Sequence, residues 1–403
     1  MSSAAHSSNT ALPGPRTLVS LASLWKMPRD PLTHMEELHR AYGDLVSYRA
    51  LGRRIFMLFH PDLTQDMLVT HARNLHQGRV MQRARKVLGT GLLTSEDSFH
   101  LRQRRLIQPA FHRQRVSGYG RAMVDIAERH QQRWKDSDVI DVHQQMMRLT
   151  LAIVGKTLFD TDVEEDAQEI SRALNTFMGL FRFAVLPLSE YLEKFPIPPV
   201  LRMKKARQRI DRIIYRFIDE RRRTGEDRGD LLSMLLAAED PEVGGHDARM
   251  SNEQVRDECV TLILAGHETT AVALTWTFYL LAQHPEIAER LKNELDRVLG
   301  GRPPTPDDYG SLKYAEMVFS EAMRLYPPAW GIARTVIEPY DAFGTRFPKS
   351  AIVLTSQWIT HRDERWYPNP LHFEPERWTP EDRASRPKFS YFPFGAGARQ
   401  CIG

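Results

Sequence analysis

The final ten residues of the chain, FGAGARQCIG, place a cysteine in a glycine-rich loop. A thiolate that binds a metal needs a flexible backbone whose N–H groups can turn toward the sulfur, and Gly395 and Gly397 allow this. Arg399 adds positive charge nearby, and Phe394 provides an apolar wall that limits water. A lone cysteine is more often a small buried hydrophobic residue, but this setting favours a metal-binding thiolate at Cys401.

The motif AGHETT, from Ala265 to Thr270, lies inside a long apolar stretch that runs to about Leu281. Ser251 and Gln254 form a capping-box pattern at the start of this stretch, which predicts a helix. A glycine inside a helix costs ~1 kcal/mol relative to alanine, and the adjacent Thr and Glu can bind backbone carbonyls or hold water. Taken alone, the motif favours a weakly kinked core helix over a functional site.

Two short patterns place polar side chains on one helix face. Glu321 and Arg324 are three residues apart, and His100 and Arg104 are four apart, so each pair shares a face. Each pattern is weak by itself, because an exposed ion pair contributes ~0–1 kcal/mol and a single arginine is most often solvated. Arg334, in the run GIART, is a further isolated cation.

Together these segments resemble the haem-thiolate monooxygenases, the cytochrome P-450 family. The pattern F-x-x-G-x-R-x-C-x-G around Cys401 matches the cysteine loop of the family. AGHETT, Glu321-x-x-Arg324 and the PERW segment from Pro375 to Trp378 stand in the family's order. The resemblance implies a mainly α fold with small β-sheets (α+β), the cytochrome P-450 fold, lacking the C-terminal helix and the last strands.

The resemblance also implies roles for these residues. Cys401 would bind the iron of haem b (iron protoporphyrin IX). Gly266 would leave room for dioxygen on the distal haem face, Thr269 would hydrogen-bond the oxygen being activated, and Glu268 would relay protons from solvent. An alcohol backed by a carboxylate suits O–O cleavage, because that step consumes two protons. The implied cofactor-binding residues are His100, Arg104, Ala265, Gly266, Arg334, Phe394, Gly395, Arg399 and Cys401.

Other implied roles are structural or electrostatic. Glu321 would be shared between Arg324 and Arg377 in a buried cluster that fixes the cysteine loop. The cations of the cofactor-binding set would face two propionate carboxylates, since charge-assisted hydrogen bonds are strong. Cys259, on the first turns of the AGHETT helix, is interpreted as a packing residue.

Start and stop signals place the elements that carry these residues. We expect the first three quarters of the chain to be mainly helical and the last quarter to be irregular with short strands. Residues 1–12 are expected to be a disordered lead, and residues 13–403 a single haem-thiolate monooxygenase domain, incomplete at its C-terminus. The expected elements are a helix from Pro31 to Gly43, two strands within 45–59, an amphipathic surface helix containing Ile210 to Ile218, a helix from Pro285 to Gly300, and strands at 334–337 and 352–356.

Composition narrows the class of protein. The 403 residues are 42% hydrophobic with a formal charge of +4, which we interpret as a solvated surface. Asp211, Asp219 and Glu220 break up the charge of the amphipathic helix, which disfavours nucleic-acid binding. Two cysteines cannot form a disulfide framework and fit a reducing compartment. Without an apolar run of ~18 residues or a signal-peptide layout, we expect a cytoplasmic monomer with no membrane span and no nucleic-acid partner.

The resemblance also guides expectations about substrate and electron supply. Segments that line the pocket in the family are apolar and aromatic here, so we expect a lipophilic substrate. Electrons would come from a separate ferredoxin or flavodoxin with its reductase, both acidic proteins. The cations expected to meet that donor are Arg102, Arg105, Arg113 and Arg115. The expected pocket residues are Leu88, Phe177, Met178, Leu180, Phe181, Phe183, Val185, Leu186, Trp330 and Ile332.

Three functions remain open at this point. The leading one is an external monooxygenase that inserts one oxygen atom of dioxygen into its substrate, with electron density from Cys401 favouring O–O cleavage. A peroxide-using enzyme is disfavoured by the Glu268-Thr269 pair. The alternative is a haem-binding sensor or inactive truncated relative. Family members continue past the cysteine into a helix whose N-terminus would add partial positive charge, so we expect this 403-residue form to bind haem weakly or not at all.

Overall fold

The structure is a computed structural model of the 403-residue chain. It describes residues 12–15, 23, 26–50, 52–160, 172–173, 176, 195–240, 242 and 248–403. The described residues group into two compact units. The first lies within Met1–Gly78, Trp330–Pro370 and Pro387–Arg399, and the second within Arg79–Ala329, Leu371–Arg386 and Gln400–Gly403. We call them the sheet unit and the helical unit. The expected disordered lead, residues 1–12, lies outside the described residues except for Leu12.

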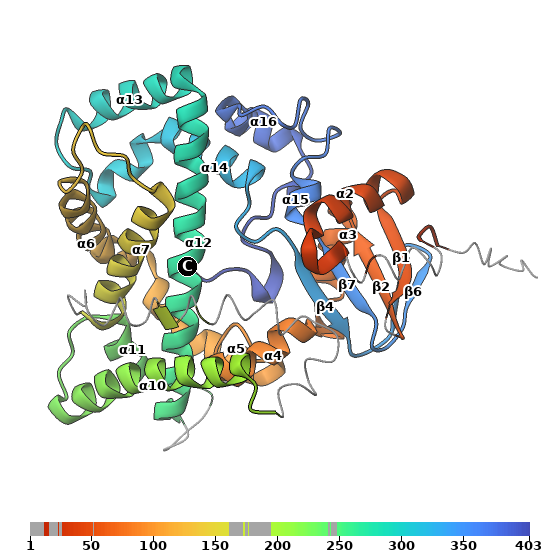
Figure 1. Ribbon diagram of the computed structural model, residues 1–403, viewed down its shortest axis with the longest axis horizontal. Helices are drawn as coiled ribbons and strands as arrows, with labels where there is room; N and C mark the ends of the chain where they lie inside the picture. Colours follow the sequence, from red (N-terminus) through yellow and green to blue (C-terminus); the bar gives the residue numbers. More distant parts are fainter. Residues whose placement is uncertain are drawn as a thin grey trace, which may run out of the picture. The chain divides into compact units, whose positions relative to one another are not determined.

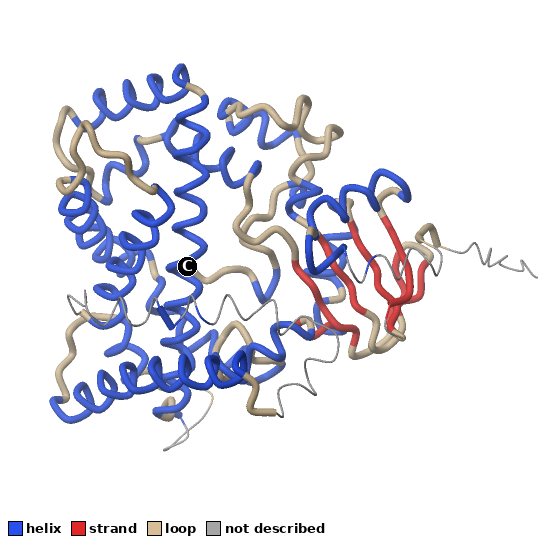
Figure 2. The backbone as a smooth tube through the Cα atoms, in the orientation of Figure 1, coloured by secondary structure: helices blue, strands red, loops and turns tan. Residues whose placement is uncertain are grey.

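The sheet unit is built on a five-stranded sheet in the order β1-β2-β7-β4-β3 (Figures 1 and 2). β1 and β2 form an antiparallel hairpin, β2 runs parallel to β7, and β4 is antiparallel to both β7 and β3. A smaller sheet pairs β5 with β6. The strands are β1 (Leu45–Ala50), β2 (Arg53–Leu58), β3 (Leu75–Gln77), β4 (Ile332–Val336), β5 (Tyr340–Ala342), β6 (Thr345–Phe347) and β7 (Ile352–Thr355).

Helix α2 (Pro31–Tyr42) shows how residues next to a helix determine where it begins and ends. The Asp30 side chain accepts a hydrogen bond from the Thr33 N–H at 3.1 Å, and Gly43, at φ 82°, ends the helix. The helix and the early hairpin are therefore confirmed. The remaining helical segments of the sheet unit are α3 (Pro61–Gln65), the π-helical turn η1 (Asp66–Thr70), η2 (Ala72–Asn74), α15 (Gln357–Thr360), η7 (Lys388–Ser390) and η8 (Gly397–Arg399).

The helical unit contains the long helices. They are α4 (Arg79–Leu88), α5 (Asp97–Ile107), α6 (Arg113–Gln131), α7 (Val142–Phe159), α10 (Pro198–Thr224), α11 (Leu231–Ala237), α12 (Asn252–Gln283), α13 (Pro285–Leu299) and α14 (Lys313–Leu325). Shorter segments are η3 (Gln108–Phe111), η5 (Pro306–Ser311), η6 (Pro375–Trp378) and α16 (Pro380–Ser385). The chain is thus mainly α with small β-sheets, as expected.

Helix α12 is the central element of the helical unit (Figure 1). It begins at the expected capping box, in which the Ser251 side chain accepts from the Gln254 N–H and the Gln254 side chain accepts from the Ser251 N–H. It packs against α7, α10 and α14. Cys259 is fully buried in the apolar core of this unit, as expected for a packing residue. α13 ends at Gly300 in the left-handed conformation, which confirms the expected helix boundary.

None of the helices among the described residues is both long and apolar enough to cross a membrane.

Candidate active site

The Cys401 segment lies against α5 and η3 of the helical unit. Arg104 of α5 donates a hydrogen bond from Nη1 to the carbonyl oxygen of Gln400 at 2.8 Å. A Cβ added to Gly403 would lie 2.8 Å from the Phe111 ring, so the segment passes close to η3. The Cys401 thiol is exposed and donates to the Gly403 carbonyl at 2.9 Å, whereas Cys259 is fully buried. Of the two cysteine sulfur atoms, only that of Cys401 is accessible to a ligand.

The glycines before Cys401 belong to the sheet unit and have positive φ angles. Gly395 has φ 66° and Gly397 φ 68°, the left-handed region that favours glycine. A Cβ at Gly397 would lie 2.3 Å from the Leu68 carbonyl oxygen, so η8 packs on η1 through this residue. Phe394 is half exposed and Arg399 is partly buried. These glycines are therefore required for the shape of the loop.

One face of α12 exposes small and polar side chains in the middle of the helix. Ala265 and Thr269 are both exposed and lie one turn apart. The Thr269 hydroxyl donates to the Ala265 carbonyl oxygen at 2.6 Å. This i−4 bond satisfies the hydroxyl locally, and the oxygen keeps lone pairs with which it can accept a further hydrogen bond.

The next two residues of the motif face α7. A Cβ at Gly266 would lie 3.3 Å from Cγ2 of Val154, which is the contact that glycine relieves. His267 is buried, its Nε2 lies 3.1 Å from the Met147 carbonyl oxygen, and its own carbonyl accepts from the Thr150 hydroxyl at 3.0 Å. Burial lowers the pKa of His267, so it is neutral and Nε2 donates. These two residues fix α12 to α7, and the role of Gly266 in admitting dioxygen stays a prediction.

Glu268 lies between these two faces of α12 and is partly buried. Burial raises the pKa of its carboxyl group above the usual range, and His143 opposes this shift. A carboxyl group titrating closer to neutral pH can accept and donate a proton under the same conditions. The role of Glu268 as a proton carrier is compatible with this shift and stays a prediction.

The four cations or potential cations expected at the propionates have different surroundings, and Arg399 among them is partly buried, as described above. His100 is buried in α5. Arg104 bonds the backbone next to Cys401, as described above. Arg334 of β4 donates from Nη1 to the Gln77 side chain at 2.7 Å across the β3–β4 pair. Their contact with a propionate stays a prediction.

Glu321 of α14 is the centre of a fully buried cluster. Arg324 binds it through two hydrogen bonds of 2.7 and 2.8 Å. Trp378 Nε1 donates to it at 2.9 Å, and the Glu374 N–H at 3.1 Å. Arg377 lies 3.5 Å from Glu321 but pairs more closely, at 2.6 Å, with Glu374. The predicted Glu–Arg–Arg group is thus brought together, and the sequence reasoning missed Trp378 as its fourth member.

A second buried polar cluster on α12 was not predicted. Arg256 pairs with Asp257 at 2.8 Å and with Asp211 of α10, and it donates to the Val87 carbonyl at 3.0 Å. Asp257 accepts from the Thr90 N–H at 2.6 Å, and Glu258 accepts from the Leu92 N–H at 2.8 Å. The signal in the sequence was a charged run, Arg256 to Glu258, at the start of an apolar helix.

This cluster holds the segment between α4 and α5 close to α12. Gly89 has φ 76°, and a Cβ there would lie 2.0 Å from the Asp257 carboxylate. A Cβ at Gly91 would lie 2.4 Å from the Thr261 hydroxyl. Since Glu258, Ala265 and Thr269 recur at spacings of seven and four residues, they share one face of α12. The docked segment therefore lies on the same helix face as Thr269, about three turns earlier.

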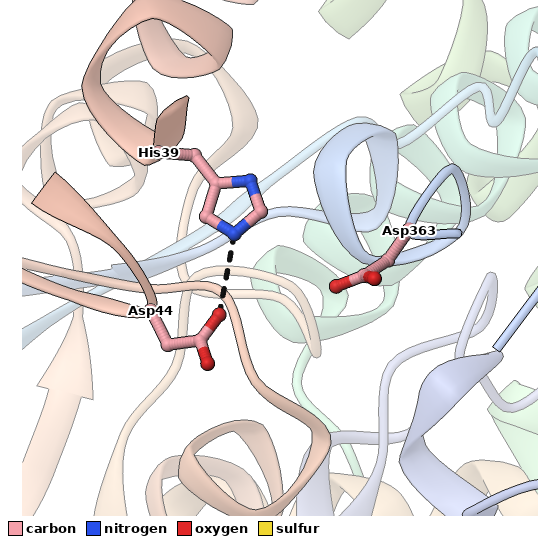
Figure 3. A group of neighbouring side chains, drawn as sticks. All are labelled: His39, Asp44 and Asp363. Atoms are coloured by element: carbon pink, nitrogen blue, oxygen red, sulfur yellow. Dashed lines mark hydrogen bonds and ion pairs between the residues drawn. The ribbon is translucent and has the colours of Figure 1, made fainter. Parts of the chain in front are cut away.

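In the sheet unit, His39, Asp44 and Asp363 bring together side chains of the types that bind metals (Figure 3). Their ligand atoms lie within 4.8 Å of one another. Arg365, however, donates to Asp44 at 2.7 and 2.8 Å and to Asp363 at 2.9 Å. The Arg365 guanidinium holds the pKa of Asp44 well below its usual range. The carboxylates already have a cation, so this group is a structural ion cluster.

The residues expected to line the pocket are distributed as follows. Leu88 is buried in the core of the helical unit, and in the sheet unit Trp330 is exposed and Ile332 is partly buried in β4. The remaining expected pocket residues lie outside the described residues, namely Phe177, Met178, Leu180, Phe181, Phe183, Val185 and Leu186.

The four arginines expected to meet an electron donor fall into two classes. Arg102 and Arg105 both pair with Asp240, at 3.1 and 3.3 Å, and Arg105 also pairs with Glu242 at 2.9 Å. Arg113 and Arg115 are exposed on the first turn of α6. The first pair is therefore engaged within the chain, and the second pair presents its charge to solvent.

Comparison with known sequences identifies the class of protein to which this fold and this set of residues belong. A family model described as cytochrome P450 matches residues 12–403, and the chain belongs to the cytochrome P450 family. It is 41% identical to cyclooctatin synthase of Streptomyces melanosporofaciens, over 99% of this chain and 86% of that protein. It is 38% identical to pentalenene oxygenase of Streptomyces avermitilis, over 94% of this chain and 83% of that protein.

A third relative and a solved structure agree with this assignment. Cyclooctat-9-en-7-ol 5-monooxygenase of Streptomyces melanosporofaciens is 35% identical over 94% of this chain and 82% of that protein. The crystal structure of the cytochrome P450DA heme domain aligns with a TM-score of 0.85 at 28% identity, covering 97% of this chain and 87% of that one. The chain is accordingly a haem-dependent monooxygenase, and the family takes electrons from a redox partner.

The residues present fit a haem. Cys401 offers an accessible sulfur, and the loop before it is shaped by Gly395 and Gly397. Ala265 exposes only a methyl group on α12, which is compatible with close approach of a flat macrocycle. The donor set thus contains a soft ligand suited to iron.

Proposed function

We propose that Cys401 binds the iron of haem b as a thiolate and that the protein inserts one oxygen atom of dioxygen into a lipophilic substrate. The observation that carries this proposal is the accessible sulfur of Cys401, held next to α5 by the Arg104–Gln400 hydrogen bond of 2.8 Å. We also propose His100, Arg104, Arg334 and Arg399 as partners of the propionates, with Ala265, Gly266, Phe394 and Gly395 packing against the macrocycle.

When bound, haem supplies the iron chemistry that activates dioxygen with two electrons and releases one oxygen atom as water. Glu268 and Thr269 have the task of supplying two protons. The Glu268 carboxyl, whose pKa is raised by burial, takes a proton from solvent and passes it toward the exposed face of α12. The Thr269 hydroxyl, released from the Ala265 carbonyl, donates that proton onward and then accepts the next one.

The relatives support a lipophilic substrate. One acts on pentalenene and another on cyclooctat-9-en-7-ol, names that denote an alkene and an unsaturated alcohol. Such molecules offer C–H bonds and few polar groups. We propose an unsaturated hydrocarbon or its alcohol as the substrate class for this chain.

The electron donor is proposed to be a ferredoxin or flavodoxin with its reductase. Arg105, Arg113 and Arg115 are the exposed cations of the predicted set, and an acidic donor would meet them. Arg105 and the partly buried Arg102 also pair with Asp240 of the same chain. The protein is further proposed to act as a cytoplasmic monomer, as one domain over residues 13–403, without a nucleic-acid partner.

The ligand assignment is tested by Cys401→Ser, with Cys259→Ala as the matched control. The reduced protein with carbon monoxide should show the thiolate-specific absorption band in the parent and in the control, and should lose it completely in Cys401→Ser. Circular dichroism establishes that the helices are intact. A thiolate band that survives in Cys401→Ser would contradict the assignment.

A further inference from the structure

The first two thirds of helix α10 are strongly basic. Residues 198–216 contain seven Lys and Arg residues and one Asp, a formal charge of +6. The whole sequence carries +4, so all other residues together are net −2. α10 is therefore strongly basic, and so are residues 79–121, which contain ten Lys and Arg residues and two acidic ones.

Five of these cations form a stripe along one face of α10. Since residues at i, i+3, i+7, i+10 and i+14 recur on one side of a helix, these five share a face, and all are exposed. Over 14 residues at 1.5 Å each, the stripe is about 21 Å long. We name it the basic stripe; it consists of Arg202, Lys205, Arg209, Arg212 and Arg216.

The acidic residue of this segment does not neutralise the basic stripe. Asp211 pairs with the buried Arg256 of α12, at 2.7 Å from its Nε, and with Arg207 at 3.5 Å. Beyond the stripe, Glu220 pairs with Arg228 at 3.2 Å. Asp211 was expected to break up the positive charge of α10. Its side chain instead pairs with a buried arginine of the helical unit.

The opposite face of α10 is apolar and buried. Ile210, Ile214 and Ile218 are at most 1% exposed and pack in the core of the helical unit. α10 runs along the lower edge of that unit in Figure 1. The helix is therefore held firmly by one face while it presents the basic stripe on another.

Exposed apolar residues lie at the N-terminal end of the basic stripe. Phe195 is 60% exposed and Leu201 43% exposed. Pro196 and Pro198 beside them are exposed as well. A row of cations next to exposed apolar side chains is the pattern of a surface that rests in the headgroup region of a bilayer.

We propose that the basic stripe docks this protein on an anionic lipid bilayer. Arg and Lys would contact the headgroups, each contributing to the attraction of a negatively charged leaflet, and Phe195 and Leu201 would enter the interface. An acidic protein is the competing occupant. The bilayer is favoured because the stripe is straight, lacks acids of its own, and ends in apolar residues that an acidic protein surface would leave in water. A substrate of the proposed lipophilic class would be concentrated in the same membrane.

The test measures co-sedimentation of the purified protein with vesicles, comparing phosphatidylglycerol–phosphatidylcholine with phosphatidylcholine alone. The test variant replaces all five residues of the basic stripe with Gln. The control variant removes the same total charge at exposed cations elsewhere in the helical unit: Arg121→Gln, Arg129→Gln, Arg133→Gln, Lys135→Gln and Arg297→Gln.

The parent and the control variant should bind the anionic vesicles with affinities within about two-fold of each other, and the stripe variant at least about ten-fold more weakly. Phe195→Ser with Leu201→Ser should cost about five-fold. Binding should fall as salt is raised from ~0.1 M to ~1 M, where the screening length shrinks from ~10 to ~3 Å.

Three outcomes would overturn the proposal. The first is no preference of the parent protein for anionic vesicles. The second is an equal loss in the stripe and control variants, since net charge alone would then explain binding. The third is a stripe variant that keeps its vesicle affinity but is reduced more slowly by an acidic ferredoxin, which would make the stripe a protein-docking surface. The vesicle measurement does not require haem, so it is independent of the ligand assignment.

Discussion

Two stretches of α12 carry polar groups in contrasting ways. Arg256 to Glu258 are buried, and each side chain is bonded to another part of the helical unit. Two turns later, Ala265 and Thr269 are exposed and Glu268 is only partly buried. Buried polar groups that are bonded to other parts of the chain hold the fold, whereas polar groups left on an accessible face can serve a ligand. One helix therefore supports the scaffold with its first turns and presents in its middle the accessible face to which we assign the proposed chemistry.

The largest effect is expected from Arg256→Leu, which leaves the Asp257 carboxylate buried without its cation. Breaking a buried ion pair from one side costs about 3–5 kcal/mol, so the free energy of unfolding should fall by that amount in denaturant titrations. Arg297→Leu, an exposed change on α13, is the matched control and should stay within about 0.5 kcal/mol. A fall of less than about 1 kcal/mol for Arg256→Leu would remove the proposed contrast between the two stretches.

Glu258 makes the free energy of unfolding depend on pH through the first stretch. Burial raises the pKa of its carboxyl group from the ordinary 4.5 to about 8, with Asp257 adding to the shift and the Leu92 N–H opposing it. Between those values the folded protein holds a proton that the unfolded chain releases. The contribution to stability is therefore intact below pH 4.5 and is lost as the pH rises toward 8, with a slope of at most ~1.4 kcal/mol per pH unit.

Glu258→Gln should flatten this part of the stability profile, because an amide has no such proton to lose and its oxygen can still accept from Leu92. Denaturant titrations at several pH values across this window give the slope for each protein. Glu253→Gln, exposed on the first turn of the same helix, should leave the slope unchanged. If parent and Glu258→Gln show the same slope, Glu258 does not titrate in this range.

A smaller energetic effect, confined to activity, is expected in the second stretch. Glu268→Gln and Thr269→Ala should each lower product formed per electron consumed by about 100-fold, the lower end of the range for a lost proton-transfer group. Their free energies of unfolding should change by less than about 1 kcal/mol. Thr269→Ser should retain most activity and Thr270→Ala, an exposed neighbour, nearly all. Unchanged product yield in Thr269→Ala, together with lower stability, would assign Thr269 to the scaffold.

The sequence predicted elements well where a few adjacent residues decide the structure. Asp30 and Gly43 bound α2, Ser251 and Gln254 cap α12, and Gly300 ends α13. Each signal acts within one helical turn, so no knowledge of the rest of the chain is needed. The hairpin of β5 and β6 was not anticipated, because strands of three residues carry too little alternation to read.

The candidate site was predictable to the extent that motifs mark it. Cys401 and AGHETT stand out through residue types, and the Glu321 pair through spacing. The partners that make these groups structural come from distant positions: Trp378 reaches Glu321 from 57 residues away, and the Thr90 N–H reaches Asp257 from 167 away. A backbone N–H has no sequence signature, so the cluster around Asp257 could not be derived from residue types alone.

The close approach of α12 to α7 at Gly266 links the side-chain sizes that two positions can have. A Cβ at position 266 would lie 3.3 Å from Cγ2 of Val154 of α7, so Val154 would have to move away by a few tenths of an ångström. A larger side chain at position 266 would therefore need a smaller one at position 154. Relatives with alanine or serine at the position of Gly266 should carry a smaller residue at that of Val154, so an exchange of bulk between the two helices would be inherited as a pair.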